Sequence, residues 1–386
     1  MTISGKIIFF IWFLLIQFIS TAQYKVSFIM NKLPSYHKAG DKIYLAGSFN
    51  NWNPGDERYL LKTLNDKPGI IINLPKGIYE YKFTRGGWDK VEALEAGFPT
   101  ENRKMEVEND LTIHVDIEHW ADHFPPKARV STANKHVHIL DTAFYIHQLN
   151  RFRKIWIYLP ESYTASKKKY PVLYMHDGQN IFDNTTSGFG EWGVDEALDS
   201  LGPKNRDLIV VGINNDAVKR MNEYSPYDMQ RFGKGEGDQY VDFLVKTLKP
   251  FIDHHYRTLK TRKNTFIAGS SMGGLISFYS LLKYPKVFGG AGVFSPAFWI
   301  TPQLKNVDRI KAKKVKGRIY FFAGQLESES MVPDMLSVFE QMRRHSKAKM
   351  KSVIRAEGKH NEATWRKEFP LFYKWIILHK EDKLQN

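Results

Sequence analysis

The stretch around Ser271 constrains the fold of this chain more than any other feature. Residues 264–268 predict a strand and residues 274–282 predict a helix, and the motif Gly269-Ser270-Ser271-Met272-Gly273 lies between them. A strand, a Gly-x-Ser-x-Gly motif and a helix in this order predict a sharp turn that lifts the serine hydroxyl clear of the backbone. Such a serine becomes a nucleophile when a base lies beside it. The start of the following helix directs N–H groups toward negative charge that develops there.

Such a serine needs a base and an acid. We expect both in the loops that follow the later strands, because ligands collect at the carboxyl ends of strands in an α/β sheet. A strand at residues 318–322 is followed by Glu327, which we expect to be the acid. Glu329 and Asp334 remain as alternatives for this role. His360 follows the last predicted strand and precedes the last predicted helix, and we expect it to be the general base.

The first strand-to-helix loop is expected to stabilise an oxyanion. It contains His176-Asp177-Gly178-Gln179, and Gly178 allows the backbone to turn so that the Gln179 N–H points into the site. The Met272 N–H is the expected second donor. His176 and Asp177 either contact the substrate or brace the loop. Two neighbouring residues without a third ligand are poor evidence for a metal site, so no metal or cofactor is expected.

The region from residue 136 onward alternates strands and helices. Residues 154–160 predict a strand. The strands at 170–175 and 208–213 are continuous apolar runs, which are typical of a sheet buried on both faces. Helical periodicity follows at 240–255. We therefore predict a three-layer α/β domain over residues 136–386.

The region before it has a different pattern. Short alternating segments separated by turn residues predict an immunoglobulin-like β-sandwich over residues 23–120. Pro125 and Pro126 interrupt both helix and strand, so we expect a linker at 121–135.

The second domain resembles the esterase family of α/β-hydrolases, which includes esterase D-like enzymes, feruloyl and acetyl xylan esterases, enterochelin-type siderophore esterases and mycolyltransferases. The resemblance implies a serine esterase that uses Ser271, His360 and an acid after Gly324. Arg220, Glu223 and Tyr224 also resemble a family segment near the substrate cleft. The matching stretches are residues 153–160, 174–180, 269–274 and 358–360.

The first domain resembles starch- and glycogen-binding modules, on residues 44–54 and 79–88. The resemblance implies that Trp52 and Trp88 stack on sugar rings, since an indole offers a flat apolar face. The alternative is a sandwich that serves only to pack against other parts of the protein.

Residues 1–22 predict a secretory signal peptide. Lys6 precedes an apolar run at 7–19, and the small residues Ser20, Thr21 and Ala22 follow. We expect a secreted or periplasmic protein with no membrane span after cleavage; an uncleaved anchor is the alternative. The chain has no cysteine, which excludes disulfides and thiolate chemistry.

The formal net charge is +15, and basic runs occur at 167–169 and 311–318. No nucleic-acid-binding module accompanies them, so we interpret them as solvated faces that could attract anionic glycans or cell surfaces. The leading hypothesis is a secreted serine carboxylic-ester hydrolase acting on acyl or feruloyl esters of carbohydrates, or on siderophore esters. The alternatives are an acyltransferase with the same triad and a carbohydrate-binding protein with an inactive hydrolase fold.

Overall fold

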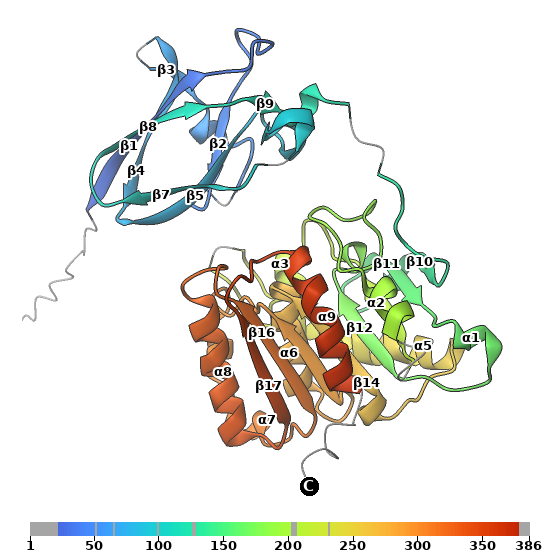
Figure 1. Cartoon of the computed structure of the whole chain (residues 1–386). Helices are drawn as coiled ribbons and strands as arrows, with labels where there is room; N and C mark the ends of the chain where they lie inside the picture. Colours follow the sequence, from blue (N-terminus) through green and yellow to red (C-terminus); the bar gives the residue numbers. More distant parts are fainter. Residues whose placement is uncertain are drawn as a thin grey trace, which may run out of the picture. The chain divides into compact units, whose positions relative to one another are not determined.

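The chain divides into two compact units, residues 1–128 and 129–386, each described here by itself (Figure 1). The predicted signal peptide, except for its last residue, lies outside the described residues. The computed structural model describes residues 22–50, 52–64, 66–98, 100–125, 129–201, 207–230 and 232–377.

The first unit is a β-sandwich, as its alternating pattern predicts. One sheet has the strand order β3-β4-β1-β8 and the other has the order β2-β5-β7. Val26 and Phe28 of β1 pack with Leu45 and Phe83 from the other sheet in one buried core. Alternate residues of each strand therefore face the core, as two packed sheets require.

The strands of this unit are β1 Gln23–Lys32, β2 Tyr44–Gly47, β3 Lys62–Leu64, β4 Lys67–Pro75, β5 Gly77–Thr84, β6 Glu92–Ala93, β7 Arg103–Val107, β8 Leu111–Asp116 and β9 His119–Trp120. The short 3₁₀ turns are η1 Glu57–Tyr59, η2 Trp88–Lys90, η3 Glu95–Gly97 and η4 Ala121–His123.

The second unit is built on an eight-stranded sheet with the order β10-β11-β13-β12-β14-β15-β16-β17. β10 and β11 are antiparallel to their neighbours, and all pairs from β13 to β17 are parallel. The parallel strands end at the same edge of the sheet, so the loops that follow them gather there. The strands are β10 Val137–Ile146, β11 Arg151–Tyr158, β12 Val172–His176, β13 Ile209–Ile213, β14 Thr265–Ser270, β15 Gly290–Phe294, β16 Arg318–Gly324 and β17 Lys349–Arg355.

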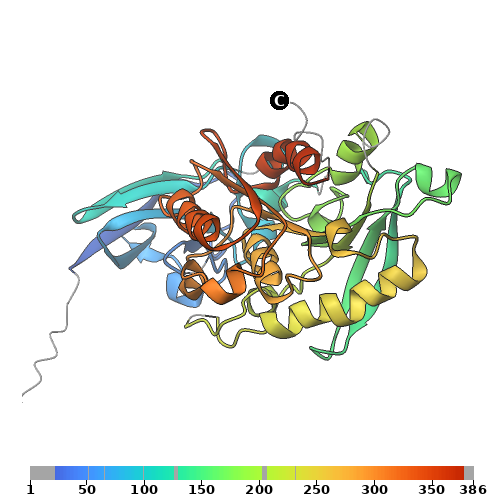
Figure 2. The same ribbon diagram turned by 90° about the horizontal axis from the view of Figure 1, so that it is seen from below.

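Helices cover both faces of this sheet, which confirms the three-layer prediction. In Figure 2 the long yellow helical segment lies on one side of the sheet and α9, in red, on the other. Two buried clusters correspond to these two layers. The helical segments are α1 Ser162–Ala165, η5 Gly178–Asn180, α2 Val194–Leu201, α3 Arg220–Glu223, α4 Gly237–Phe243, η7 Leu244–Leu248, α5 Lys249–His255, η8 Arg262–Asn264, α6 Met272–Lys283, η9 Pro302–Lys305, α7 Arg309–Ala312, α8 Met331–His345 and α9 Glu362–Ile377.

Two local features differ from the sequence-based prediction. β10 was not predicted, because its polar residues His138, Asp141 and Thr142 interrupt the apolar pattern. The predicted helix at 240–255 contains a π-helical turn at Leu244–Leu248. Among the described residues, no helix combines the length and the apolar character needed to cross a membrane.

Candidate active site

Ser271 occupies the sharp turn between β14 and α6. Its backbone has φ 57° and ψ −121°, a strained conformation for a residue with a side chain. Gly269 is needed for this turn, because a Cβ there would lie 2.8 Å from the Gly273 carbonyl carbon. The Ser271 N–H donates to the Phe294 carbonyl over 2.9 Å, and the Ala297 N–H donates to the Ser271 carbonyl over 3.1 Å. These bonds hold the serine turn against the segment that follows β15.

His360 and Glu327 form a hydrogen-bonded pair on the loops after β17 and β16. The distance between His360 Nδ1 and Glu327 Oε2 is 2.7 Å. The side chain of Glu327 is 1% exposed and that of His360 is 37% exposed. Because an ionised carboxylate can only accept, Nδ1 carries the proton in this bond and Nε2 is left as the basic nitrogen.

The structure distinguishes Glu327 from the other two candidate acids. Glu329 is exposed, and Asp334 pairs with Lys305 at 2.9 Å. Only Glu327 among the three is hydrogen-bonded to His360 in the described part of the chain.

Ser295 braces Glu327 and was missed by the sequence analysis. Its Oγ donates to Glu327 Oε1 over 2.7 Å and accepts from Trp365 Nε1 over 2.9 Å. The Gly324 N–H donates to the same carboxylate oxygen over 2.6 Å. Ser295 directly follows the carboxyl end of β15, so the rule that located Glu327 and His360 could also have found it.

The loop after β12 approaches β13 very closely. A Cβ on Gly178 would lie 2.7 Å from the Gly212 carbonyl carbon, so only glycine fits there. Gln179 follows directly in the η5 turn, and its side-chain oxygen accepts from the Asn215 N–H over 3.2 Å. Met272 is the first residue of α6, so its N–H has no partner within the helix.

An ion pair between Asp177 and Arg220 fixes this loop. The two side chains share two hydrogen bonds of 2.8 Å, and Asn215 donates to Asp177 over 2.7 Å. Burial by itself would raise the pKa of Asp177, but the Arg220 guanidinium and the hydrogen bonds hold it below its usual value. Asp177 is therefore a fixed anion whose hydrogen bonds brace the loop.

Three of the candidate substrate-binding residues, His176, Glu223 and Tyr224, are almost completely buried. His176 Nδ1 lies 3.0 Å from the Tyr240 hydroxyl, and burial lowers its pKa to about 3. Glu223 is held by Arg153 at 2.7 Å and Arg151 at 2.9 Å, and the Tyr224 hydroxyl accepts from the Asp177 N–H. These contacts fit the bracing role that the sequence analysis gave as the alternative for His176.

Glu362 is a second residue that the sequence analysis missed. It begins α9, two positions after His360, and is 6% exposed. Asn180 donates to its carboxyl group over 3.2 Å. Burial and the negative charge of Asp177 raise the pKa of Glu362 to about 7. The sequence around Glu362 gave no signal of this role. Its raised pKa comes from burial beside the η5 loop, which is distant in the sequence.

Trp52 and Trp88 lie next to each other in the first unit. Their ring centroids are 6.2 Å apart with an interplanar angle of 44°, and Trp88 is 45% exposed. Trp52 adopts a positive φ of 57° in the turn that follows β2. The two indoles therefore form one aromatic surface that is partly open to solvent. Within the described ranges, no group of three His, Asp or Glu side chains is placed to hold a metal ion.

The layered sheet and the serine turn define an α/β-hydrolase. Residues 146–375 match the family described as "Putative esterase", and the chain belongs to that family. Residues 32–114 match a second family, described as the glycogen recognition site of AMP-activated protein kinase.

Individual relatives are distant. The chain is 27% identical over 209 residues to the uncharacterized protein YbbA of Bacillus subtilis, covering 51% of this chain and 79% of that protein. It is 24% identical over 241 residues to an endo-1,4-beta-xylanase/feruloyl esterase of Xylanibacter ruminicola, covering 60% of this chain but only 30% of that protein. An alpha-amylase of Niallia circulans is 37% identical over 93 residues, which cover 23% of this chain and 7% of the amylase.

Solved structures show the same fold at low identity. The BES protein of Bacillus cereus matches with a TM-score of 0.53 and 19% identity, over 65% of this chain and 98% of that one. The enterobactin esterase FES of Shigella flexneri matches with a TM-score of 0.52 and 15% identity, over 91% of this chain and 92% of that one.

Proposed function

We propose that this protein is a serine carboxylic-ester hydrolase in which Ser271 is the nucleophile, His360 the general base and Glu327 the acid. The observation that carries the proposal is the 2.7 Å bond between Glu327 and His360, on loops at the edge of the sheet where Ser271 also lies. A connected set of bonds supports it: Ser271 binds the backbone around Ser295, Ser295 binds Glu327, and Glu327 binds His360.

The proposed reaction has two halves. Ser271 Oγ attacks the ester carbonyl carbon while His360 Nε2 takes the hydroxyl proton, and the tetrahedral intermediate then expels the alcohol, which receives that proton. Water repeats the sequence on the acyl-enzyme, which releases the free acid and restores the serine. Glu327 keeps Nδ1 protonated and stabilises the imidazolium that forms in each half.

The oxyanion of both intermediates would be bound by the backbone N–H groups of Gln179 and Met272. The close approach of Gly178 to β13 and the ion pair of Asp177 hold the first donor's loop in place. Loss of one such donor typically costs about 3–4 kcal/mol in the transition state.

The acyl group is proposed to be apolar or aromatic. Three large hydrophobic side chains are exposed on loops that follow the carboxyl ends of β12, β15 and β16: Phe189 at 83%, Trp299 at 51% and Leu326 at 57%. Exposed apolar groups at the edge that carries a site are typical of a binding surface. The feruloyl esterase relative named above makes a feruloyl ester the first substrate to test, and a siderophore ester such as enterobactin the second.

The first unit is proposed to bind α-glucan chains through Trp52 and Trp88, which would hold the esterase near carbohydrate-linked esters. The partly exposed indole pair supports this role. We also propose that the protein is secreted or periplasmic, on the basis of the predicted signal peptide at 1–22.

The test is hydrolysis of methyl ferulate and p-nitrophenyl acetate by the protein and by Ser271→Ala, with Ser328→Ala as a control on an exposed loop serine. We expect the Ser271 variant to lose about 10³-fold or more in kcat and the control to keep its rate. Product analysis should find free acid; a new ester formed with an added sugar would indicate acyl transfer instead. A Ser271→Ala protein that hydrolyses esters at the original rate would overturn the proposal.

A further inference from the structure

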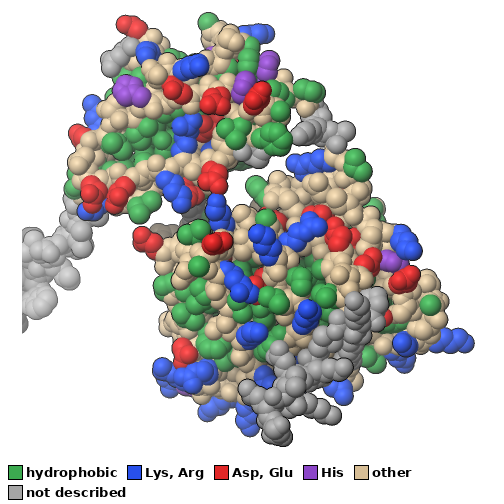
Figure 3. All heavy atoms as spheres, viewed as in Figure 1, with side chains coloured by type: hydrophobic (Ala, Val, Ile, Leu, Met, Phe, Trp, Pro, Cys, Tyr) green, Lys and Arg blue, Asp and Glu red, His purple; other side chains and the backbone are tan. Residues whose placement is uncertain are grey.

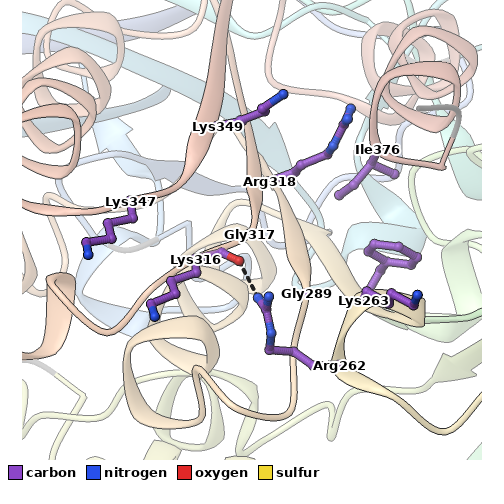
Figure 4. A pocket seen from close by; sticks show the side chains of 10 residues that line it. Arg262, Lys263, Gly289, Lys316, Gly317, Arg318, Lys347, Lys349 and Ile376 are labelled. Atoms are coloured by element: carbon purple, nitrogen blue, oxygen red, sulfur yellow. Dashed lines mark hydrogen bonds between the residues drawn. The ribbon is translucent and has the colours of Figure 1, made fainter. Parts of the chain in front are cut away.

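A basic pocket lies at the edge of the sheet opposite the candidate active site. It has a volume of about 290 Å³ and is lined at the amino ends of β14, β15, β16 and β17. The candidate catalytic residues follow the carboxyl ends of the same strands, so a ligand here would not touch them. Figure 4 shows this pocket at close range.

Six cationic side chains from three separate segments line the pocket, and its lining includes no acidic residue among those that the structure describes. Figure 3 shows Lys and Arg side chains gathered along the lower edge of the second unit in that view. The six are Arg262, Lys263, Lys316, Arg318, Lys347 and Lys349.

Four of these cations have no carboxylate partner in the part of the chain that the structure describes. No ion pair there involves Arg262, Lys263, Lys316 or Lys347. The Arg262 guanidinium donates to the Lys316 carbonyl, so a backbone contact fixes its position beside the pocket (Figure 4). Like charges held together repel one another, and a bound anion relieves that repulsion.

The wall of the pocket is partly apolar. Phe266 of β14 and Ile376 of α9 are almost completely buried, and Gly289 and Gly317 also line the pocket. The cations therefore line one hollow together with two buried apolar side chains, whereas Lys167, Lys168 and Lys169 follow one another along an exposed segment.

We propose that this pocket binds a small dissolved oxyanion that carries at least two phosphate or sulfate groups. Several Lys and Arg donors around one hollow suit tetrahedral oxyanions, and the four cations that have no ion pair among the described residues favour an anion with more than one negative charge. The site is independent of ester hydrolysis, since it lies at the other edge of the sheet.

The test is calorimetric titration of the full protein with inorganic pyrophosphate, beside orthophosphate and chloride at equal ionic strength. We expect saturable binding of one pyrophosphate per chain, weaker binding of orthophosphate and none of chloride. The double variant Lys316→Ala/Lys347→Ala should bind pyrophosphate at least 10-fold more weakly and hydrolyse esters at an unchanged rate.

The matched control is Lys167→Ala/Lys169→Ala, which removes the same charge from an exposed loop. It should keep the affinity of the unaltered protein. All four lysines are exposed, and thermal unfolding of each variant verifies that it folds. Binding that is absent, that does not saturate, or that both double variants weaken equally would overturn the proposal, because each result means that only general charge attraction is at work.

Discussion

Ser295 is a side chain outside the proposed triad that helps to hold the proposed acid in its orientation. It is hydrogen-bonded to both Glu327 and Trp365, and Trp365 also contacts the His360 ring edge-on, with centroids 5.1 Å apart. Ser295 thus links the proposed acid to the helix that follows the proposed base. Its backbone φ of 44° is unusual for a residue with a side chain and fits a constrained position.

Substitution of Ser295 by alanine should lower kcat about 10-fold with little change in KM. A hydrogen bond to a charged group contributes about 1.5–3 kcal/mol, and part of that holds Glu327 in its orientation. Ser337→Ala on α8 is the control. An unchanged kcat in Ser295→Ala would show that Ser295 only fills space.

Glu362 gives a prediction for stability against pH. Its pKa is raised to about 7, so between pH 4.5 and 7 the folded protein keeps a proton that the unfolded chain has released. Its contribution to stability is therefore present at low pH and lost as the pH rises through 7. Relative to Glu362→Gln, the protein should lose about 3 kcal/mol of unfolding free energy between pH 5 and pH 8.5.

The measurement for Glu362 is denaturant unfolding of both proteins at several pH values. Asp195, whose pKa burial raises to about 8, is present in both, so its effect cancels in the difference. Glu329→Gln, which makes the same substitution at an exposed position, is the control. A difference between the protein and Glu362→Gln that stays constant with pH would contradict the raised pKa.

At the scale of elements, the position of the loop after β12 depends on the close approach of Gly178 to the backbone of β13. Gly178→Ala should lower kcat more than 100-fold, because the new methyl group would push the loop away from β13 and displace the Gln179 N–H. Gly188→Ala is a matched control in the same connection, where nothing lies within 4 Å of an added Cβ. Circular dichroism should show both variants folded. Full activity in Gly178→Ala would contradict the proposed oxyanion donor.

The elements that could be predicted are those with a local pattern. Apolar runs marked the buried strands, and the serine turn, Glu327 and His360 follow from the rule that sites gather at the carboxyl ends of strands. β10 could not be predicted, because His138, Asp141 and Thr142 interrupt its apolar residues. The burial of His176 and Glu223, and the bracing by Ser295, depend on contacts between segments distant in the sequence.

At the scale of the whole molecule, we expect each unit to supply one measurable property: glycogen binding by the first unit and ester hydrolysis by the second. Trp52→Ala/Trp88→Ala should weaken retention in glycogen-containing gels at least 10-fold, because stacking supplies much of the contact with a sugar face. Hydrolysis of soluble methyl ferulate should be unchanged. Ile78→Ala, at an exposed position of β5, is the control. Equal retention of all three proteins would show that the sandwich does not bind glucan through this pair.

The central claim is that Ser271 is a nucleophile activated by His360, and covalent labelling tests it most directly. A fluorophosphonate should form one P–O bond per chain with release of fluoride, and mass spectrometry should locate the adduct on the peptide that contains Ser271. Ser271→Ala should take up no label, and His360→Ala should react far more slowly. A protein that hydrolyses esters yet carries no adduct at Ser271, or carries it equally on other serines, would contradict the account.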